Sequence, residues 1–341
     1  MANKKVDIFA VAKAARVSPS TVSRRFNHPD LVKPATRKRI DTAVQRLGYI
    51  RNRAAPTLHG LRSGTIGMIV PTIDHMIFAE LIQSFSETVE EQGFTIMLAS
   101  HGYDLDREYA LIRKMLEHRV DGIALIGLEH SEKTTVLLAR QNVATVTLWS
   151  HSQEATLPSI GFDNFEAGQL IGDHVCALGH RAIATLFPPV EGNDRAEHRF
   201  RGVLHALGSN RISPDDCAHI QSHYSIAAAK EAVLRLLSAQ PMPTVILCGN
   251  DVQAWGAMHA IRQCGLSVPD DICVAGIGDF RGSAEFEPPL TTIRIPARRI
   301  GHHSGNAITR HILSPDTQIV HQKIDPELVV RTSTLRQQRA V

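Results

Sequence analysis

The 341-residue chain lacks the sequence signals of a secreted or membrane-bound protein. It contains no run of about 18 apolar residues, so no segment is long enough to cross a bilayer as a helix. Its first seven residues, MANKKVD, include none of the apolar stretch that defines a secretory signal. The sequence therefore predicts a cytoplasmic protein with no membrane partner.

Common catalytic and cofactor motifs are also missing. There is no glycine-rich dinucleotide turn, no phosphate loop ending in GK[ST], no GxSxG and no HExxH. The five cysteines form no CxxC pair and show no His-Cys spacing, which favours reduced thiols over a metal site or a disulfide framework. We therefore expect no metal and no cofactor, and none of these motifs indicates an enzyme.

Acidic residues are scarce at one end of the chain. Of 37 Lys or Arg and 34 acidic residues, residues 1–64 hold 14 and 3, which leaves 23 and 31 for the remainder. This segregation is typical of a nucleic-acid-binding head on an acidic body, with a merely solvated basic tail as the alternative. A chain of this length is expected to form two or three domains.

Residues 7–27 contain the pattern of two short helices. Asp7 is a good N-cap for a first helix, and Ser18 followed by Pro19 is a second helix start. The apolar stripe of the first helix consists of Ile8, Val11, Ala12 and Ala15. The spacing predicts a helix-turn-helix, with a plain surface pair of helices as the alternative.

The second of these helices has a short, polar and basic outer face. Val22 and Phe26 share its inward face, and the outward residues are Ser20, Thr21, Ser23 and Arg24. Hydroxyls of this kind bind phosphates and an arginine reads a guanine edge, so we expect this helix to enter the major groove of DNA. A third helix from Pro34 to Leu47, ended by Gly48, completes a small bundle over residues 1–50.

Residues 51–64 have the composition of a linker but include a possible short helix. Asn52 can cap it, and it would run through Ala55 to Leu58 before Gly60. Pro56 removes a backbone donor from a helix of barely two turns, so we expect it to form only on DNA. A flexible linker is the alternative.

From residue 65 onward, short apolar runs alternate with helical patterns. The runs cover residues 66–71, 95–100, 121–127, 143–149, 182–187, 243–249 and 271–276. This rhythm predicts two doubly wound α/β lobes, each with a parallel sheet and with ligand at the carboxyl ends of the strands. The pattern alone leaves open whether this body is an enzyme or a binding module.

The head resembles the LacI/GalR family of bacterial transcriptional repressors. The resemblance rests on Val11-Ala12-Lys13, Val17-Ser18, Thr21-Val22-Ser23-Arg24 and the closing Asn27. Arg16 stands where the family has glycine in the turn, so we expect a slightly altered turn and not a lost motif. The DNA-binding residues implied by the resemblance are Pro19, Ser20, Thr21, Ser23, Arg24 and Asn27 in the head, with Asn52, Ala55 and the wedging Leu58 in the hinge.

The body is similar to the effector domain of the same family. The matching segments are residues 78–80, 120–122, 162–164, 248–251 and 289–293, with Arg199 three residues before Gly202. The resemblance implies that the body is a binding module and not an enzyme, with no catalytic residue. It further implies a homodimer on a near-palindromic double-stranded DNA operator. It also implies two lobes that close over a small molecule, approximately residues 65–163 plus 293–325 and 164–292 plus 326–341 of the 65–341 domain. The implied effector-binding residues are Ile77, Phe78, His130, Ser150, Asp163, Arg199, Asn250 and Asp279.

The gluconate- and idonate-responsive members look most similar, particularly over residues 49–54, 92–99 and 160–167. Gly278 stands where many sugar-responsive relatives have an aspartate, and loss of that charge suits an anionic ligand. The resemblance therefore implies a repressor of sugar-acid genes, with a neutral sugar as effector, or an activator, as the alternatives.

Overall fold

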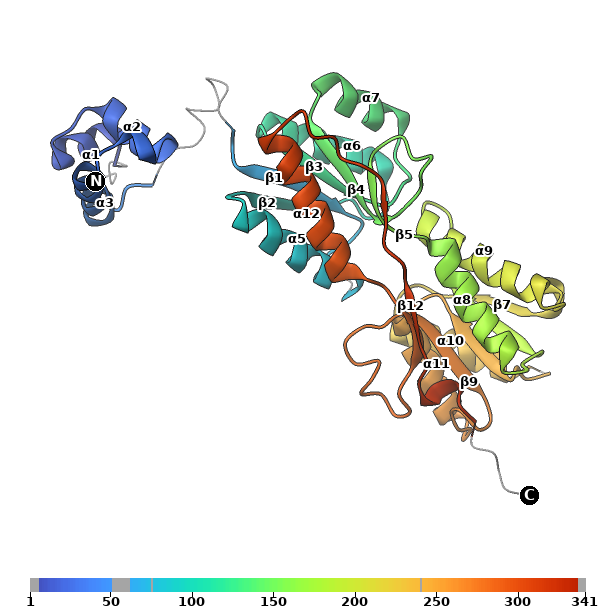
Figure 1. Cartoon of the computed structure of the whole chain (residues 1–341). Helices are drawn as coiled ribbons and strands as arrows, with labels where there is room; N and C mark the ends of the chain where they lie inside the picture. Colours follow the sequence, from blue (N-terminus) through green and yellow to red (C-terminus); the bar gives the residue numbers. More distant parts are fainter. Residues whose placement is uncertain (1–5, 51–61, 75, 240, 337–341) are drawn as a thin grey trace. The chain divides into compact units, whose positions relative to one another are not determined.

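The computed structural model describes residues 6–50, 62–74, 76–239 and 241–336, with the backbone alone at residue 77. Contacts within the chain divide it after Ser63 into a head and a body (Figure 1). Within the described residues, no helix is both long and apolar enough to cross a membrane. The head and the body are described in turn.

The head consists of α1 (Ile8–Ala15), α2 (Pro19–Asn27), the 3-10 turn η1 (Pro29–Leu31) and α3 (Pro34–Leu47). Asp7 Oδ1 accepts a hydrogen bond from the Ala10 amide at 2.8 Å, and Ser18 Oγ accepts from the Thr21 amide at 3.2 Å. Both predicted N-caps are therefore confirmed. Lys33 contributes no side-chain cap to α3. The core of the head is formed by Val11, Ala12, Ala15, Val22, Val32, Ile40 and Ala43.

Arg16 occupies the turn between α1 and α2 in the left-handed conformation, with φ 54° and ψ 51°. The next amide, that of Val17, donates to the Ala12 carbonyl at 3.0 Å, which closes the end of α1. The backbone thus keeps the left-handed turn although a side chain replaces the usual glycine. The cost is about 1 kcal/mol, which the packed helices on either side can offset.

The body contains two six-stranded sheets, one in each lobe (Figure 1). The first sheet has the order β11-β5-β4-β3-β1-β2 and is parallel throughout. Its strands are β1 (Thr65–Val70), β2 (Thr95–Ser100), β3 (Gly122–Ile126), β4 (Ala144–Ser150), β5 (Ser159–Phe162) and β11 (Gln322–Lys323). Its helices are η2 (Met76–Phe78), α5 (Ala79–Glu91), α6 (Leu105–Glu117), α7 (Glu132–Gln141) and α12 (Ala297–Leu313), and α12 packs beside α5.

The second sheet has the order β12-β10-β9-β8-β6-β7, and only its edge strand β12 runs antiparallel. Its strands are β6 (Ile183–Phe187), β7 (Ala218–Gln221), β8 (Val245–Cys248), β9 (Cys273–Gly278), β10 (Thr291–Arg294) and β12 (Glu327–Val329). Its helices are α8 (Asn164–Ala177), α9 (Asp194–Ser209), η3 (Pro214–Asp216), α10 (Ile226–Leu237), α11 (Asp251–Gln263) and η4 (Thr332–Thr334). The predicted pair of doubly wound lobes is therefore confirmed.

Three crossovers join the lobes, after β5, β10 and β11. The second follows Arg294, next to the approximate bound at residue 293. Ile293 pairs with Ile277 inside the second sheet and is completely buried, so the chain returns to the first lobe after the end of β10.

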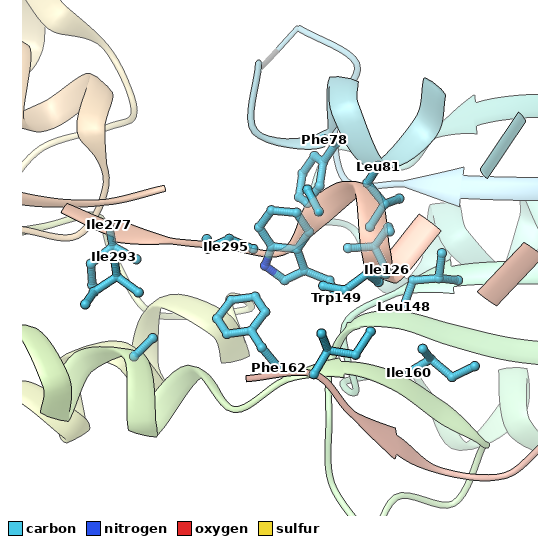
Figure 2. Close-up of a cluster of buried hydrophobic side chains, with 14 of the residues drawn as sticks. Phe78, Leu81, Ile126, Leu148, Trp149, Ile160, Phe162, Ile277, Ile293 and Ile295 are labelled. Carbon is cyan, nitrogen blue, oxygen red and sulfur yellow. The ribbon is translucent and has the colours of Figure 1, made fainter. Parts of the chain in front are cut away.

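Apolar packing between the lobes continues across the crossovers (Figure 2). Trp149, at the end of β4, lies between Phe78 and Phe162 with edge-to-face ring contacts at 5.1 and 5.7 Å. Ile277, Ile293 and Ile295 extend the same cluster from the second lobe. Trp149 has a positive φ of 80° and a buried indole N–H with no hydrogen-bond partner in the described part of the chain. Strain of this kind marks positions held by their surroundings.

Candidate DNA-binding and effector sites

The outer face of α2 presents the residues predicted to contact DNA. Arg24 and Ser20 are exposed, and Thr21, Ser23 and Asn27 are partly exposed. Ser18 Oγ lies 2.8 Å from both Ser20 Oγ and Thr21 Oγ1, and Asn27 Nδ2 donates to Ser23 Oγ at 3.2 Å. Pro19 is the first residue of the helix. These hydroxyls are thus held in a fixed arrangement on one face before any ligand arrives.

The neighbouring arginine on α2 is engaged within the head. Arg25 Nε donates to Asp41 Oδ1 and Arg25 Nη2 donates to Asp41 Oδ2, each at 3.0 Å. This two-pronged ion pair joins α2 to α3. By contrast, Arg24 makes no ion pair with any described residue.

The predicted hinge residues Asn52, Ala55 and Leu58 lie outside the described residues, as does Pro56. The hinge helix therefore stays a prediction.

In the body, a fully buried arginine lies on α9 of the second lobe. Arg199 is 1% exposed; its Nε donates to the Arg195 carbonyl at 3.2 Å and its Nη2 to the Tyr224 hydroxyl at 3.3 Å. Its Nη1 has no hydrogen-bond partner among the described residues, and no described carboxylate lies within ion-pair distance. Burial lowers the pKa of Arg199. A buried guanidinium without a counter-ion is costly, so this geometry calls for an acceptor from outside the chain.

The first lobe contributes a buried histidine and glutamate to the same region. His130 Nδ1 lies 3.0 Å from Glu108 Oε1, and both side chains are almost completely buried. His130 Nε2 has no partner among the described residues, and neither has either ring nitrogen of His101. Burial lowers the pKa of His101, and the nearby Glu108 acts in the opposite direction. The carboxylate thus orients His130 with one nitrogen left to bind a further group.

The two lobes touch directly at this edge. The Leu128 amide donates to Asp194 Oδ2 at 3.1 Å, and Asp194 Oδ1 accepts from Arg195 Nη1 at 2.7 Å. The Arg195 guanidinium lies 5.9 Å from the centre of the Tyr103 ring. Burial raises the pKa of Tyr103 to about 12. We call this group the interlobe polar cluster, and its members are His101, Tyr103, Glu108, His130, Asp194, Arg195, Arg199 and Tyr224.

Gly127, at the end of β3, makes this close approach possible. A Cβ at Gly127 would lie 2.2 Å from Arg195 Nη1 and 3.3 Å from Asp194 Oδ1. Residue 127 also has a positive φ of 91°, which other residues rarely adopt. Any larger residue would therefore be strained at this φ and would displace the guanidinium of Arg195.

The structure brings two of the predicted effector residues, His130 and Arg199, into the interlobe polar cluster. Phe78 belongs instead to the aromatic contact with Trp149. Ser150 accepts from Asn164 Nδ2 at 3.1 Å, Asp163 caps α8 and Asn250 caps α11. The side chain of Ile77 is outside what the structure describes.

Asp279 lies apart from the cluster. Its carboxylate pairs with Arg294 and Arg331, each at 2.7 Å. It lines a cavity of about 760 Å³ beside the crossovers, together with Met76, Trp149, Phe280 and Ile295. Because Arg294 and Arg331 already pair with this carboxylate, Asp279 is less available to a ligand than Arg199 is.

Sequence reasoning missed most of the interlobe polar cluster. His101, Glu108, Asp194, Arg195 and Tyr224 belong to no motif that was singled out. One signal was present: Arg195 and Arg199 are four residues apart, and therefore share one face of a helix. The first-lobe members follow or flank separate strands, and only the closed packing of two lobes brings them to α9.

Known proteins match this chain over nearly its full length and share its fold. Residues 8–52 match the family model described as bacterial regulatory proteins of the lacI family, and residues 173–334 match the periplasmic binding protein-like domain. The HTH-type transcriptional repressor PurR of Aliivibrio fischeri (strain MJ11) is 31% identical over 328 residues, which cover 95% of this chain and 97% of that protein.

Two solved structures have the same arrangement of elements. A crystal structure of the Lac repressor dimer, bound to operator and the anti-inducer ONPF, superposes with a TM-score of 0.87 at 29% identity, over 97% of this chain and all of that one. A LacI-family regulator from Silicibacter pomeroyi also gives a TM-score of 0.87, at 24% identity over 97% of this chain and all of that one, and supports the fold alone. These proteins are regulators. The chain belongs to the lacI family of bacterial regulatory proteins, and is a DNA-binding transcription regulator with a helix-turn-helix head and a two-lobed effector-binding domain.

Proposed function

We propose that this chain is a dimeric repressor that binds a near-palindromic operator and responds to a small anionic effector held in the interlobe polar cluster. The PurR relative is named a repressor, and the Lac repressor is described as a dimer on its operator with a small molecule bound. Those descriptions support repression, dimerisation and ligand control here. Acting on chromosomal DNA, the repressor would work in the cytoplasm.

The observation that carries the ligand proposal is the unpaired charge of Arg199. Its Nη1 is buried, unpartnered among the described residues and flanked by Arg195, whose own carboxylate partner is Asp194. An incoming carboxylate would accept from Nη1 and neutralise the buried cation in one step. Hydroxyl groups on the same molecule would meet His130 Nε2 and the Tyr224 hydroxyl, which lie on opposite lobes.

A sugar acid such as gluconate carries both a carboxylate and hydroxyl groups. We therefore propose a sugar acid as the effector. A neutral sugar would leave Arg199 without a counter-ion, which is the physical reason for ranking it second. Because the ligand would touch both lobes, it would favour one lobe arrangement over the other. The coupling to DNA affinity equals that difference in binding free energy, typically about 1 to 3 kcal/mol.

Calorimetric titration of the full chain tests the effector. The panel is gluconate, 2-ketogluconate, ribose and galactose, each at several ionic strengths. The proposal expects heat from one or both acids and none from the neutral sugars. Binding of a neutral sugar alone would refute the anionic effector while leaving the regulator intact.

Fluorescence anisotropy on a duplex that the protein enriches from a random pool tests the coupling. A change in DNA affinity on adding the bound acid would establish control and its sign. A fall means release and a rise means promotion of binding. If an acid binds by calorimetry and DNA affinity does not move, the control mechanism proposed here is wrong.

A further inference from the structure

Adjacent arginines on α2 have different surroundings. Arg24 is exposed and makes no ion pair with a described residue, whereas Arg25 is about one quarter exposed and bound through two nitrogens to Asp41. In such a fork the planar guanidinium and the carboxylate fix each other in distance and in orientation. Arg25 therefore ties α2 to a defined place on α3.

Apolar packing holds α2 at few points. Val22 is the one residue of α2 that is fully buried, whereas α1 buries Val11, Ala12 and Ala15. Phe26, one turn later on the same face, is half-buried against the core of the head and contacts the Tyr49 ring at 6.2 Å between centres. Both apolar contacts lie on one face, so little else limits small rotations of this short helix about its axis. The fork to α3 adds a fixed contact beside that face.

Acidic residues are rare in the head, and two of them stabilise its structure through hydrogen bonds. Asp7 caps α1 and Asp41 binds Arg25. A free carboxylate near the phosphates of DNA would repel them, and a free Arg25 would attract any duplex whatever its sequence. The pair removes both effects at once.

We propose that Arg25 is a positioning residue for DNA recognition and that Asp41 withholds it from the phosphate backbone. The fork sets the rotation of α2, so that Arg24 and the hydroxyls of Ser20 and Thr21 meet the groove in register. Arg25 thereby adds to the preference for the operator without adding sequence-independent attraction.

The salt dependence of binding distinguishes positioning from contact. Each phosphate contact contributes a slope of about −0.9 to log K against log salt, whereas a residue that only positions a helix contributes none. Anisotropy is measured with the full chain on a duplex enriched from a random pool and on a random-sequence duplex of equal length. Arg25→Gln should bind the enriched duplex roughly 10-fold more weakly. The double variant Arg25→Gln/Asp41→Asn leaves no free carboxylate and should keep the wild-type slopes on both duplexes. Arg24→Gln is the matched neighbour, and its slope or its base preference should change.

Asp41→Asn keeps the shape of the side chain and releases Arg25 to contact phosphate. For this variant the slope of log K against log salt on random DNA should steepen by about 0.9. The ratio of its affinity for the enriched duplex to its affinity for random DNA should fall. A shallower slope for the double variant Arg25→Gln/Asp41→Asn would make Arg25 a phosphate contact and overturn the proposal. Unchanged affinities in both variants would overturn it too.

A melting curve by circular dichroism checks that each variant is folded. If Arg25→Gln unfolds the head, Arg25→Lys keeps the charge and loses the fork. The proposal then expects a reduced ratio of enriched to random affinity, and an unchanged ratio would refute it. If no sequence is enriched from the pool, the slopes on random DNA still decide whether Arg25 touches phosphate.

Discussion

The head and the body each contain an arginine without a carboxylate partner. One is exposed to solvent and the other is buried, and this difference decides what each can bind. Arg24 in the head is exposed, and water stabilises its charge whether or not DNA is present. Arg199 in the body is buried, and its Nη1 finds no acceptor in the described part of the chain. An unpaired exposed cation is free to bind a polyanion, whereas an unpaired buried cation is an incomplete site.

The same contrast extends to how each region is held together. In the head, three short helices share a small core, and polar caps and the Arg25–Asp41 pair add definition. In the body, closely packed helices and sheets enclose polar groups that no solvent reaches. Substitutions should therefore act on binding in the head and on both stability and binding in the body.

The largest expected effect is a loss of stability in the body, where Gly168 lies at the close contact between α8 and α9. A Cβ at Gly168 on α8 would lie 1.9 Å from the Arg199 carbonyl on α9. Gly168→Ala should therefore separate the two helices and destabilise the body by about 3 kcal/mol or more, because overpacking against backbone cannot be relieved by a rotamer change. Chemical denaturation of the full chain measures it, with Gly208→Ala as the control, since a Cβ at Gly208 would meet no atom within 4 Å. Equal stability of the two variants would contradict the prediction.

Removing the buried charge should weaken effector binding without loss of DNA binding. Arg199→Gln loses charge-assisted hydrogen bonds worth about 1.5 to 3 kcal/mol, or roughly 10- to 150-fold in affinity for an anionic effector. Arg201→Gln is the control, because Arg201 is exposed on the same helix. Calorimetry with the acid that binds the wild type gives the result. Retention of wild-type affinity by Arg199→Gln would mean that the anion binds elsewhere.

Removing the exposed charge should affect DNA alone. Arg24→Ala should cost roughly 1 to 3 kcal/mol on the preferred duplex and relax one base position, as for an arginine that reads a guanine. Effector affinity in the absence of DNA should stay at the wild-type value. Anisotropy across single-base variants of the duplex measures the base preference. A uniform loss on every variant would instead assign Arg24 to the phosphates.

Acid should weaken the body before the head, because the histidines that burial depresses lie in the body. His180 is 7% exposed, its Nδ1 lies 2.9 Å from Thr244 Oγ1, and burial lowers its pKa to about 4. The unfolded chain takes up this proton near pH 6.5 and the folded chain only near pH 4. Stability is therefore lost as pH falls from about 6.5 to 4.

His180→Gln should reduce that acid loss by about 1 to 2 kcal/mol, allowing for screening of a ring close to the surface. At pH 7 its stability should differ little from the wild type if glutamine keeps the bond to Thr244. Denaturation curves at pH 7, 6, 5 and 4 provide the test, with His28→Gln in the head as the exposed control. The same acid loss in wild type and His180→Gln would show that this histidine is not responsible.

Much of the fold follows from local rules. The N-caps at Asp7 and Ser18, the end of α3 at Gly48 and the alternation of strands and helices after residue 65 are all contained in a few neighbouring residues. The short strands β5, β7, β10, β11 and β12 were not predicted. They have two to four residues each, so their conformation depends on the strands beside them more than on their own pattern.

The sequence by itself determined that a basic helix-turn-helix precedes two parallel α/β lobes, because caps, periodicity and charge act between near neighbours. It singled out Arg24 as the outward arginine but gave Arg25 no partner, because that partner, Asp41, lies 16 residues away on another helix. Nor did it assemble His130, Arg195 and Arg199, which two separate lobes bring together. Only the tertiary structure decided which charges are exposed and which are buried, because solvent exposure is set by everything packed around a side chain.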